Sequence, residues 1–188
     1  MTPATYLRTK FIILSEQRSG SQYLADLLRS HNAVCVAGEI FNPCIKHCAT
    51  DELTKNFSHL REEDPATFLE MFYNQTLNEL CTHIGFRLFH NHALHKPHRL
   101  IWKALQKMKG LKVIHLQRQN LLNNYLSLRL AERSNKWQRL EGQPIENFKP
   151  IFLEYDKLMK HIKLKEKNIS RGSHFFRNHQ MLNIFYED

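Results

Sequence analysis

A polar turn between a predicted strand and a predicted helix is the first place where this chain could do chemistry. Residues 11–15 (FIILS) form an apolar run typical of a strand buried on both faces, and residues 19–30 have leucines at helical spacing. The turn RSGS, residues 18–21, lies where the helix starts, and free N–H groups at a helix start bind anions. Gly20 lets the backbone approach an anion, and Arg18 adds a full positive charge. The pattern predicts a phosphate site; an ordinary strand-to-helix turn with a serine N-cap is the alternative.

An arginine and a serine nine residues apart form a second candidate anion site. Residues 112–116 (KVIHL) predict a strand, Arg118 follows it, and Ser127 lies in the helix predicted over residues 119–137. Because the carboxyl ends of parallel strands meet at one edge of a sheet, we expect Arg118 beside the first turn. The two side chains could then hold one phosphate from two sides. The alternative is a surface arginine and a serine bonded to its own helix carbonyl.

The cluster of Cys44, His47 and Cys48 raises the question of a zinc site. It supplies only three ligands, at a spacing that standard zinc fingers do not use. A fourth ligand would have to come from Cys81 or from a distant histidine. We therefore predict no metal.

Apolar runs and helical periodicity alternate along the chain. Strands are predicted at residues 11–15, 34–41, 84–89, 112–116 and 181–186, and helices at residues 19–30, 64–80, 98–109, 119–137 and 145–166, the last bent or split by Pro150. Strands that alternate with helices of this length predict an α/β fold with a central parallel sheet flanked by helices. The basic run at residues 157–167 is interpreted as the solvated face of its helix.

Length and charge limit the classes of function. The 188 residues suffice for a single domain, residues 1–188, and 27 Lys and Arg against 18 Asp and Glu give a formal charge of +9, which favours polyanionic partners. No apolar run approaches the roughly 18 residues of a membrane span, and the N-terminus does not resemble a signal peptide. We therefore expect no transmembrane segment, a cytoplasmic location and reduced thiols at the four cysteines.

Together, the two candidate anion sites resemble those of the sulfotransferases that use 3′-phosphoadenosine 5′-phosphosulfate (PAPS). Residues 18–21 are similar to the family's 5′-phosphosulfate loop, and residues 113–131 to its 3′-phosphate segment, with Arg118 and Ser127 as the matching residues. The stretches GEIFNP and IFYED, which begin at Gly38 and Ile184, resemble the bacterial carbohydrate sulfotransferases that act on trehalose or lipopolysaccharide. The arginine-to-serine gap, longer than in many sulfotransferases, also fits this subgroup, whereas the C-terminus is short for the family.

The resemblance implies a P-loop-like three-layer fold, PAPS as the sulfuryl donor, 3′-phosphoadenosine 5′-phosphate (PAP) as the product, and no metal. Arg18 is then expected to stabilise the leaving group, and the backbone N–H groups from Ser19 to Gln22 are expected to hold the 5′-phosphate. The nucleotide-binding residues that the resemblance predicts are Arg18, Ser19, Gly20, Ser21, Gln22, Tyr23, Arg118 and Ser127.

Transfer to a hydroxyl also needs a base. Glu39 is the first candidate, because it ends the strand expected beside the loop and matches a glutamate of the carbohydrate subgroup. His31 is a weaker rival at a helix end. His90 and His92 follow the third predicted strand, where they could line an acceptor pocket or be ordinary loop residues.

The sequence thus predicts a PAPS-dependent sulfotransferase that moves a sulfuryl group, by in-line transfer, to a hydroxyl of a carbohydrate or glycolipid-like acceptor. A kinase-like nucleotide-dependent transferase is one alternative, although the Gly-x-x-x-x-Gly-Lys-Ser/Thr motif and a clear magnesium carboxylate are missing. A non-catalytic polyanion-binding module is another. Nucleic acid is not an expected partner, because no recognised nucleic-acid-binding motif is present. The oligomeric state is left open.

Overall fold

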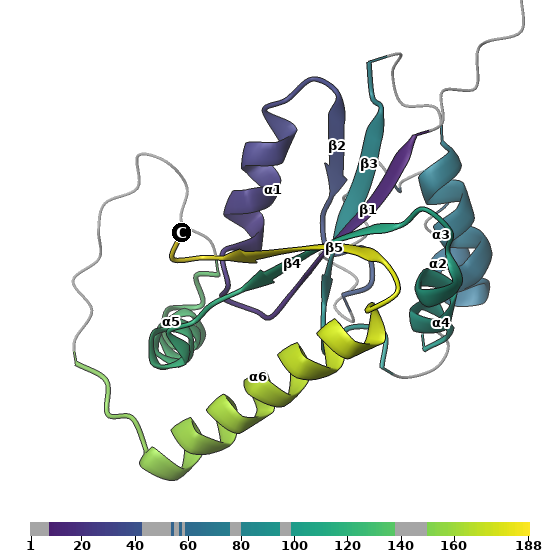
Figure 1. Ribbon diagram of the computed structural model, residues 1–188. Helices are drawn as coiled ribbons and strands as arrows, with labels where there is room; N and C mark the ends of the chain where they lie inside the picture. Colours follow the sequence, from purple (N-terminus) through teal and green to yellow (C-terminus); the bar gives the residue numbers. More distant parts are fainter. Residues whose placement is uncertain are drawn as a thin grey trace, which may run out of the picture.

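The centre of the molecule is a parallel β-sheet. A computed structural model describes residues 8–42, 54, 57, 59–75, 80–94, 99–137 and 150–188. Within these residues, five strands follow the order β2-β3-β1-β4-β5, and every neighbouring pair is parallel (Figure 1). The strands are β1 (Thr9–Ser15), β2 (Val34–Ala37), β3 (His83–Phe89), β4 (Lys112–Gln117) and β5 (Gln180–Phe185). Their carboxyl ends therefore share one edge, where ligands bind in open α/β sheets.

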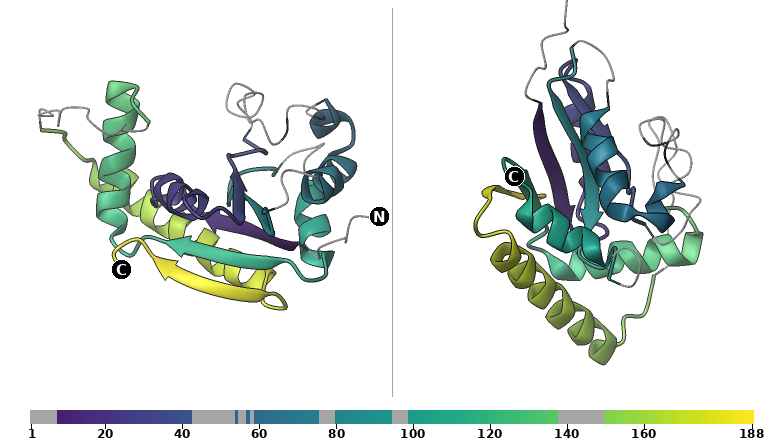
Figure 2. Two further views of the ribbon diagram at one scale, coloured as in Figure 1. Left: turned by 90° about the horizontal axis from the view of Figure 1, so that it is seen from above. Right: turned by 90° about the vertical axis from the view of Figure 1, so that its right-hand side faces the viewer.

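Helices cover both faces of this sheet (Figures 1 and 2). They are α1 (Ser21–Arg29), α2 (Leu60–Glu63), α3 (Pro65–Asn74), α4 (Leu100–Lys107), α5 (Leu121–Ser134) and α6 (Tyr155–Phe175). On one face α1 packs over Phe11 and Ile13 of β1. On the other face α3, α4 and the end of α6 pack over Ile12 and Leu14. The predicted P-loop-like three-layer α/β fold is confirmed.

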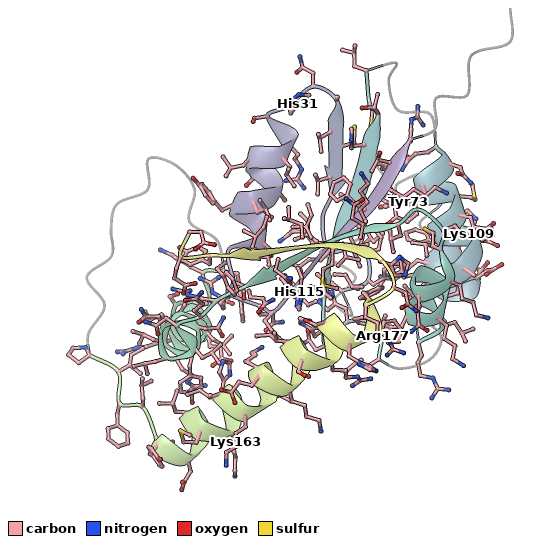
Figure 3. All side chains as sticks on the ribbon, viewed as in Figure 1. His31, Tyr73, Lys109, His115, Lys163 and Arg177 are labelled. Carbon is pink, nitrogen blue, oxygen red and sulfur yellow. The ribbon has the colours of Figure 1, made fainter. Side chains whose placement is uncertain are left out.

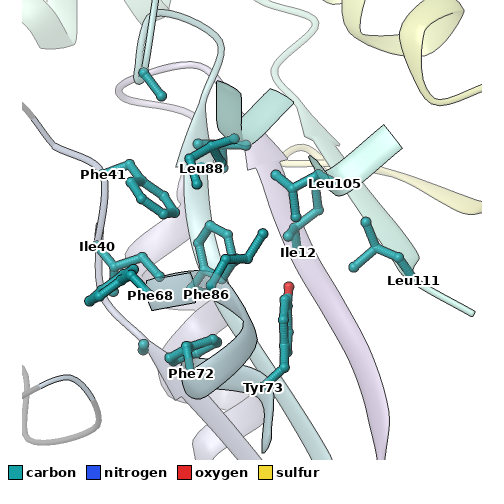
Figure 4. Close-up of a cluster of buried hydrophobic side chains, with 14 of the residues drawn as sticks. Ile12, Ile40, Phe41, Phe68, Phe72, Tyr73, Phe86, Leu88, Leu105 and Leu111 are labelled. Atoms are coloured by element: carbon teal, nitrogen blue, oxygen red, sulfur yellow. The ribbon is translucent and has the colours of Figure 1, made fainter. Parts of the chain in front are cut away.

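Aromatic side chains fill the larger core, on the α3 and α4 side of the sheet (Figure 4). Phe41, Phe68, Phe72 and Phe86 are fully buried or nearly so, and pack edge to face with ring centroids 5.5–5.7 Å apart. Tyr73 lies among them, and its hydroxyl donates to a backbone carbonyl of β1 at 3.0 Å. Burial raises the pKa of this phenol well above its usual value. Edge-to-face contacts favour a single orientation of these rings. The rings therefore hold β1 and β3 in place below the carboxyl edge of the sheet.

Two predicted elements end earlier than expected. β2 stops at Ala37 rather than residue 41, because the next residues form a turn in which the Asn42 N–H donates to the Glu39 carbonyl at 2.8 Å. α3 stops at Asn74, before an extended Gln75, rather than at residue 80. The short helix α2 has no counterpart among the predicted elements.

The last helix differs most from its prediction. α6 begins at Tyr155, after non-helical residues 150–154, and continues to Phe175, well past the predicted end at residue 166. Pro150 therefore precedes the helix and does not bend it; residues 145–149 lie outside the described part of the chain. Gly172 lies within α6, where a Cβ would overlap the His90 ring. The glycine thus lets the helix pass close to the carboxyl edge of the sheet.

Two thiols lie in the described part of the chain. Neither Cys35 nor Cys81 forms a disulfide within the described residues. Burial, together with a hydrogen bond to Cys81, raises the pKa of Cys35 to about 12. None of the described helices combines the length and the hydropathy that a bilayer crossing requires.

Candidate functional site

The turn after β1 leaves the start of α1 open to a ligand. Gly20 is the N-cap of α1 in the left-handed conformation, with φ of 82°, and no side chain caps the helix. A serine N-cap, the ordinary alternative, is therefore absent. A Cβ at Gly20 would overlap the Tyr186 ring, so the position requires glycine on two grounds. Uncapped N–H groups beside a positive helix end form a ready anion site.

The two predicted anion sites meet in space. Arg18 donates from Nε to the Ser127 hydroxyl at 3.0 Å, and Arg118 donates from Nη1 to the Arg18 carbonyl at 3.0 Å. Arg18 also donates to the backbone carbonyl of Trp137. Burial lowers the pKa of Arg18, and the nearby positive charge of Arg118 lowers it further. Two guanidinium groups held this close repel each other, and an anion bound between them would relieve that repulsion.

The residues after β5 complete this site. The Tyr186 ring lies beneath the Arg118 guanidinium, 4.6 Å from ring centroid to Cζ. The Glu187 carboxylate accepts hydrogen bonds from the backbone N–H groups of Gln119 and Asn120, both at 3.0 Å, and lies 3.9 Å from the Arg118 Nε. These contacts fix Arg118 at the start of α5. The sequence offered only the resemblance of IFYED as a signal for them.

The pKa of Glu187 gives a testable pH dependence. Burial raises this pKa, but the two backbone N–H groups and Arg118 outweigh burial and hold it below the usual value of 4.5. The ionised carboxylate therefore stabilises the fold above pH 4.5, and the stabilisation is lost as pH falls through the lowered value. We expect Glu187→Gln to cost about 1 kcal/mol at pH 7, as a lost helix cap does, and less at pH 3.5.

Urea unfolding followed by circular dichroism at the two pH values would measure this difference. Glu166→Gln, at an exposed position of α6, is the matched control. A Glu187→Gln deficit that is equal at both pH values would contradict the assignment.

Glu39 is held by three neighbours at the end of β2. Its carboxylate lies 3.1 Å from the Arg87 Nη1 and 3.8 Å from the His92 Nε2, and accepts a hydrogen bond from Asn42 at 2.6 Å. Burial, with the nearby charges of Arg87 and Arg61, lowers the pKa of His92 to about 3. The expectation that Glu39 follows a strand beside the loop is wrong, because β3 separates β2 from β1. Strand order depends on long-range packing that the local sequence does not encode.

A buried charged cluster lies beneath the loop between β1 and α1, residues 16–20. Glu16, the residue after β1, pairs with Lys165 of α6 and lies 3.2 Å from the His90 Nδ1. His115 contacts the His90 ring and the Ser173 hydroxyl, and Figure 3 shows it between the sheet and α6. Burial, with the nearby His90, lowers the pKa of His115 to about 4. Lys165 is 8% exposed, so the interpretation of residues 157–167 as wholly solvated is wrong at this position.

A second contact ties the loop to α5 and α6. The Asn124 side chain donates to the Gln17 carbonyl at 2.9 Å, and its oxygen lies 3.0 Å from the His161 Nε2. Asn124 is 1% exposed. Sequence patterns gave no signal for Glu16, Lys165 or Asn124, since a single polar residue in a loop or on a helix looks solvated until its partner is known.

The remaining predicted residues, apart from His31, lie around this centre. Ser19 and Ser21 are buried in the turn, whereas Tyr23 is 66% exposed on the first turn of α1. Gln22 donates to Asp26 along the same helix. His31 lies beyond the other end of α1, away from α5 and α6 (Figure 3), so it is not brought to the site.

The described residues contain no group of three or more side chains suited to a metal. Cys44, His47 and Cys48 fall outside those residues.

Comparison with known proteins gives a consistent group of relatives. No protein-family model matches the chain. Nodulation protein H of Rhizobium tropici is 28% identical over 181 residues, which cover 95% of this chain and 68% of the relative. The chain is similar to nodulation protein H along almost its whole length. Nodulation protein H of Rhizobium meliloti (strain 1021) is 25% identical, and a Rhizobium meliloti protein of the same name is 24% identical; each match covers 100% of this chain and 73% of the relative.

Proposed function

We propose that this chain is a PAPS-dependent sulfotransferase that acts on a hydroxyl of a carbohydrate or glycolipid-like acceptor. The observation that carries the proposal is the convergence of Arg18, Arg118 and Ser127 beside the uncapped start of α1. These groups fit a nucleotide with phosphates at two positions, because two anion sites lie side by side. The similarity to nodulation protein H along the chain supports the proposal.

Each residue then has a role. The N–H groups from Ser19 to Gln22 bind the 5′-phosphate, and Arg118 with Ser127 binds the 3′-phosphate. The acceptor oxygen bonds to sulfur as the bond from sulfur to the 5′-phosphate oxygen breaks. The hydroxyl proton passes to Glu39, and Arg18 stabilises the charge on the leaving oxygen. The products are a sulfate ester and PAP.

Calorimetric titration with PAP, AMP and ADP tests the donor. We expect PAP to bind about 10- to 100-fold more tightly than AMP, as the loss of charged hydrogen bonds predicts. Arg118→Ala should remove that preference and leave AMP binding nearly unchanged. Arg177→Ala, an exposed arginine beyond α6, is the control.

The outcomes separate the interpretations. Equal binding of all three nucleotides would refute the proposal and favour a general polyanion-binding module. Selective PAP binding without sulfuryl transfer in an acceptor screen would identify a non-catalytic relative. Preference for ADP would favour a kinase-like transferase.

A further inference from the structure

A cavity of about 300 Å³ lies between α4 and α6, on the side of the sheet opposite α1. Apolar side chains and three cations line it: Leu94, Leu100, Trp102, Phe175, Arg99, Lys103 and Arg171. This volume is at the lower end of the range for small-molecule sites. The cavity therefore suits a small ligand rather than a protein segment.

The cavity adjoins the candidate reaction centre through His90. This residue forms part of the cavity wall beside Gly172, and its Nδ1 lies 3.2 Å from Glu16 at the base of the loop. The His90 side chain is only 4% exposed, and its Nε2 has no hydrogen-bond partner among the described residues. Because this nitrogen is fully buried against Gly172 of α6, the His90 ring closes the cavity on the side of the loop.

The charge around the cavity has one sign. Arg99, Lys103 and Arg171 lie around an apolar surface, and none of the described residues that line the cavity is acidic. Across the described residues, none of the three cations forms an ion pair. Leu94 and Leu100, which both line the cavity, are 38% and 59% exposed. The complementary ligand has an apolar face and a negative charge.

We infer that this cavity binds the acceptor, and that the acceptor class is a glycoside with an apolar group and an anionic substituent. The inference rests on the proposed function. In the cavity, Trp102 and Phe175 contact the apolar group of the acceptor, and Arg99 and Arg171 pair with its anionic substituent. His90 forms the wall of the cavity on the side that faces the loop, where the sugar ring lies. A negatively charged acceptor also explains why the cations stay unpaired within the described structure.

Two matched probes test the inference: 4-nitrophenyl β-D-glucuronide and 4-nitrophenyl β-D-glucoside, which differ in one carboxylate. Calorimetry on the full chain should show the glucuronide binding about 10-fold more tightly, from one or two charged hydrogen bonds. Arg99→Gln combined with Arg171→Gln should abolish the difference. Lys163→Gln, an exposed site on the same helix labelled in Figure 3, should preserve it.

A second measurement locates the probe. The nitrophenyl group should quench Trp102 fluorescence in a Trp137→Phe background, which leaves Trp102 as the reporter. Equal binding of the two probes to the unmodified chain, binding of neither, or binding without quenching of Trp102 would overturn the inference.

PAP titration distinguishes failure of the acceptor inference from failure of the proposed function. PAP titration of the Arg99→Gln/Arg171→Gln variant should give the unmodified affinity, because neither arginine contacts the loop. Absence of a glucuronide preference in the unmodified chain, with PAP binding intact, would refute only the acceptor inference. PAP binding that is absent in the unmodified chain would refute the proposed function.

Discussion

Replacing Glu39 by glutamine is expected to lower kcat for sulfuryl transfer by about 10²- to 10⁴-fold and to leave the Kd for PAP unchanged. The amide keeps the shape of the side chain and the contact with Asn42, but it cannot accept the acceptor's proton. Glu39 is 16% exposed at its side chain, so little water is available to replace it as a base. Single-turnover kinetics with saturating PAPS would measure the effect.

His90→Asn is the comparison variant for this experiment, because His90 is the other candidate that the site offers. We expect it to reduce acceptor binding more than the transfer step. Since Glu39→Gln also removes the negative charge that lies 3.1 Å from the buried Arg87, unchanged PAP affinity is the check that the variant is folded. A full rate in Glu39→Gln, with a large loss of kcat in His90→Asn, would move the role of base to the histidine.

The second large effect is on stability. Lys165→Met is expected to lower the free energy of unfolding by about 3–5 kcal/mol, because it leaves the buried Glu16 carboxylate without its cation. The side chains of Glu16 and Lys165 are only 4% and 10% exposed, so water cannot screen the lost pair. Lys163→Met, two residues earlier and exposed, removes the same charge from the same helix and should change little.

The loss of stability in Lys165→Met should depend on pH in a way that tests the pairing with Glu16. Burial raises the pKa of Glu16, but His90 and Lys165 outweigh burial and lower it in the native protein. Without Lys165, burial acts with less opposition, so Glu16 takes up a proton more readily as the pH falls. The deficit of Lys165→Met should therefore shrink at acidic pH, and Glu16→Gln/Lys165→Met should recover much of the stability at pH 7. Urea unfolding of both variants at pH 7 and pH 5 would decide, and a deficit independent of pH would contradict the pairing.

Local patterns predicted most of the elements, and the two segments predicted to bind anions lie side by side. The apolar run before Arg18 and the strand before Arg118 are encoded in adjacent residues, and parallel topology alone brings their ends together. The predictions that were wrong depend on contacts between residues far apart in the sequence. Glu39 was expected beside the loop, but the sequence does not reveal that β3 inserts between β2 and β1. Lys165 was assigned to solvent, since a basic run on a helix gives no sign of one buried partner contributed by Glu16. The helix predicted to end at residue 166 continues to Phe175, and Gly172 in the added part lies close to His90.

The central place of β1 has a consequence for synthesis of the protein. β1 is made first, yet its two sheet neighbours begin only at His83 and Lys112. At a synthesis rate of about 5–20 residues per second, roughly 4–15 s pass between the addition of Thr9 and that of His83, the first residue of β3. Throughout that interval the fully buried Ile12, Ile13 and Leu14 have no sheet to join. This interval, when the most apolar strand has left the ribosome without partners, is when the chain most needs a chaperone.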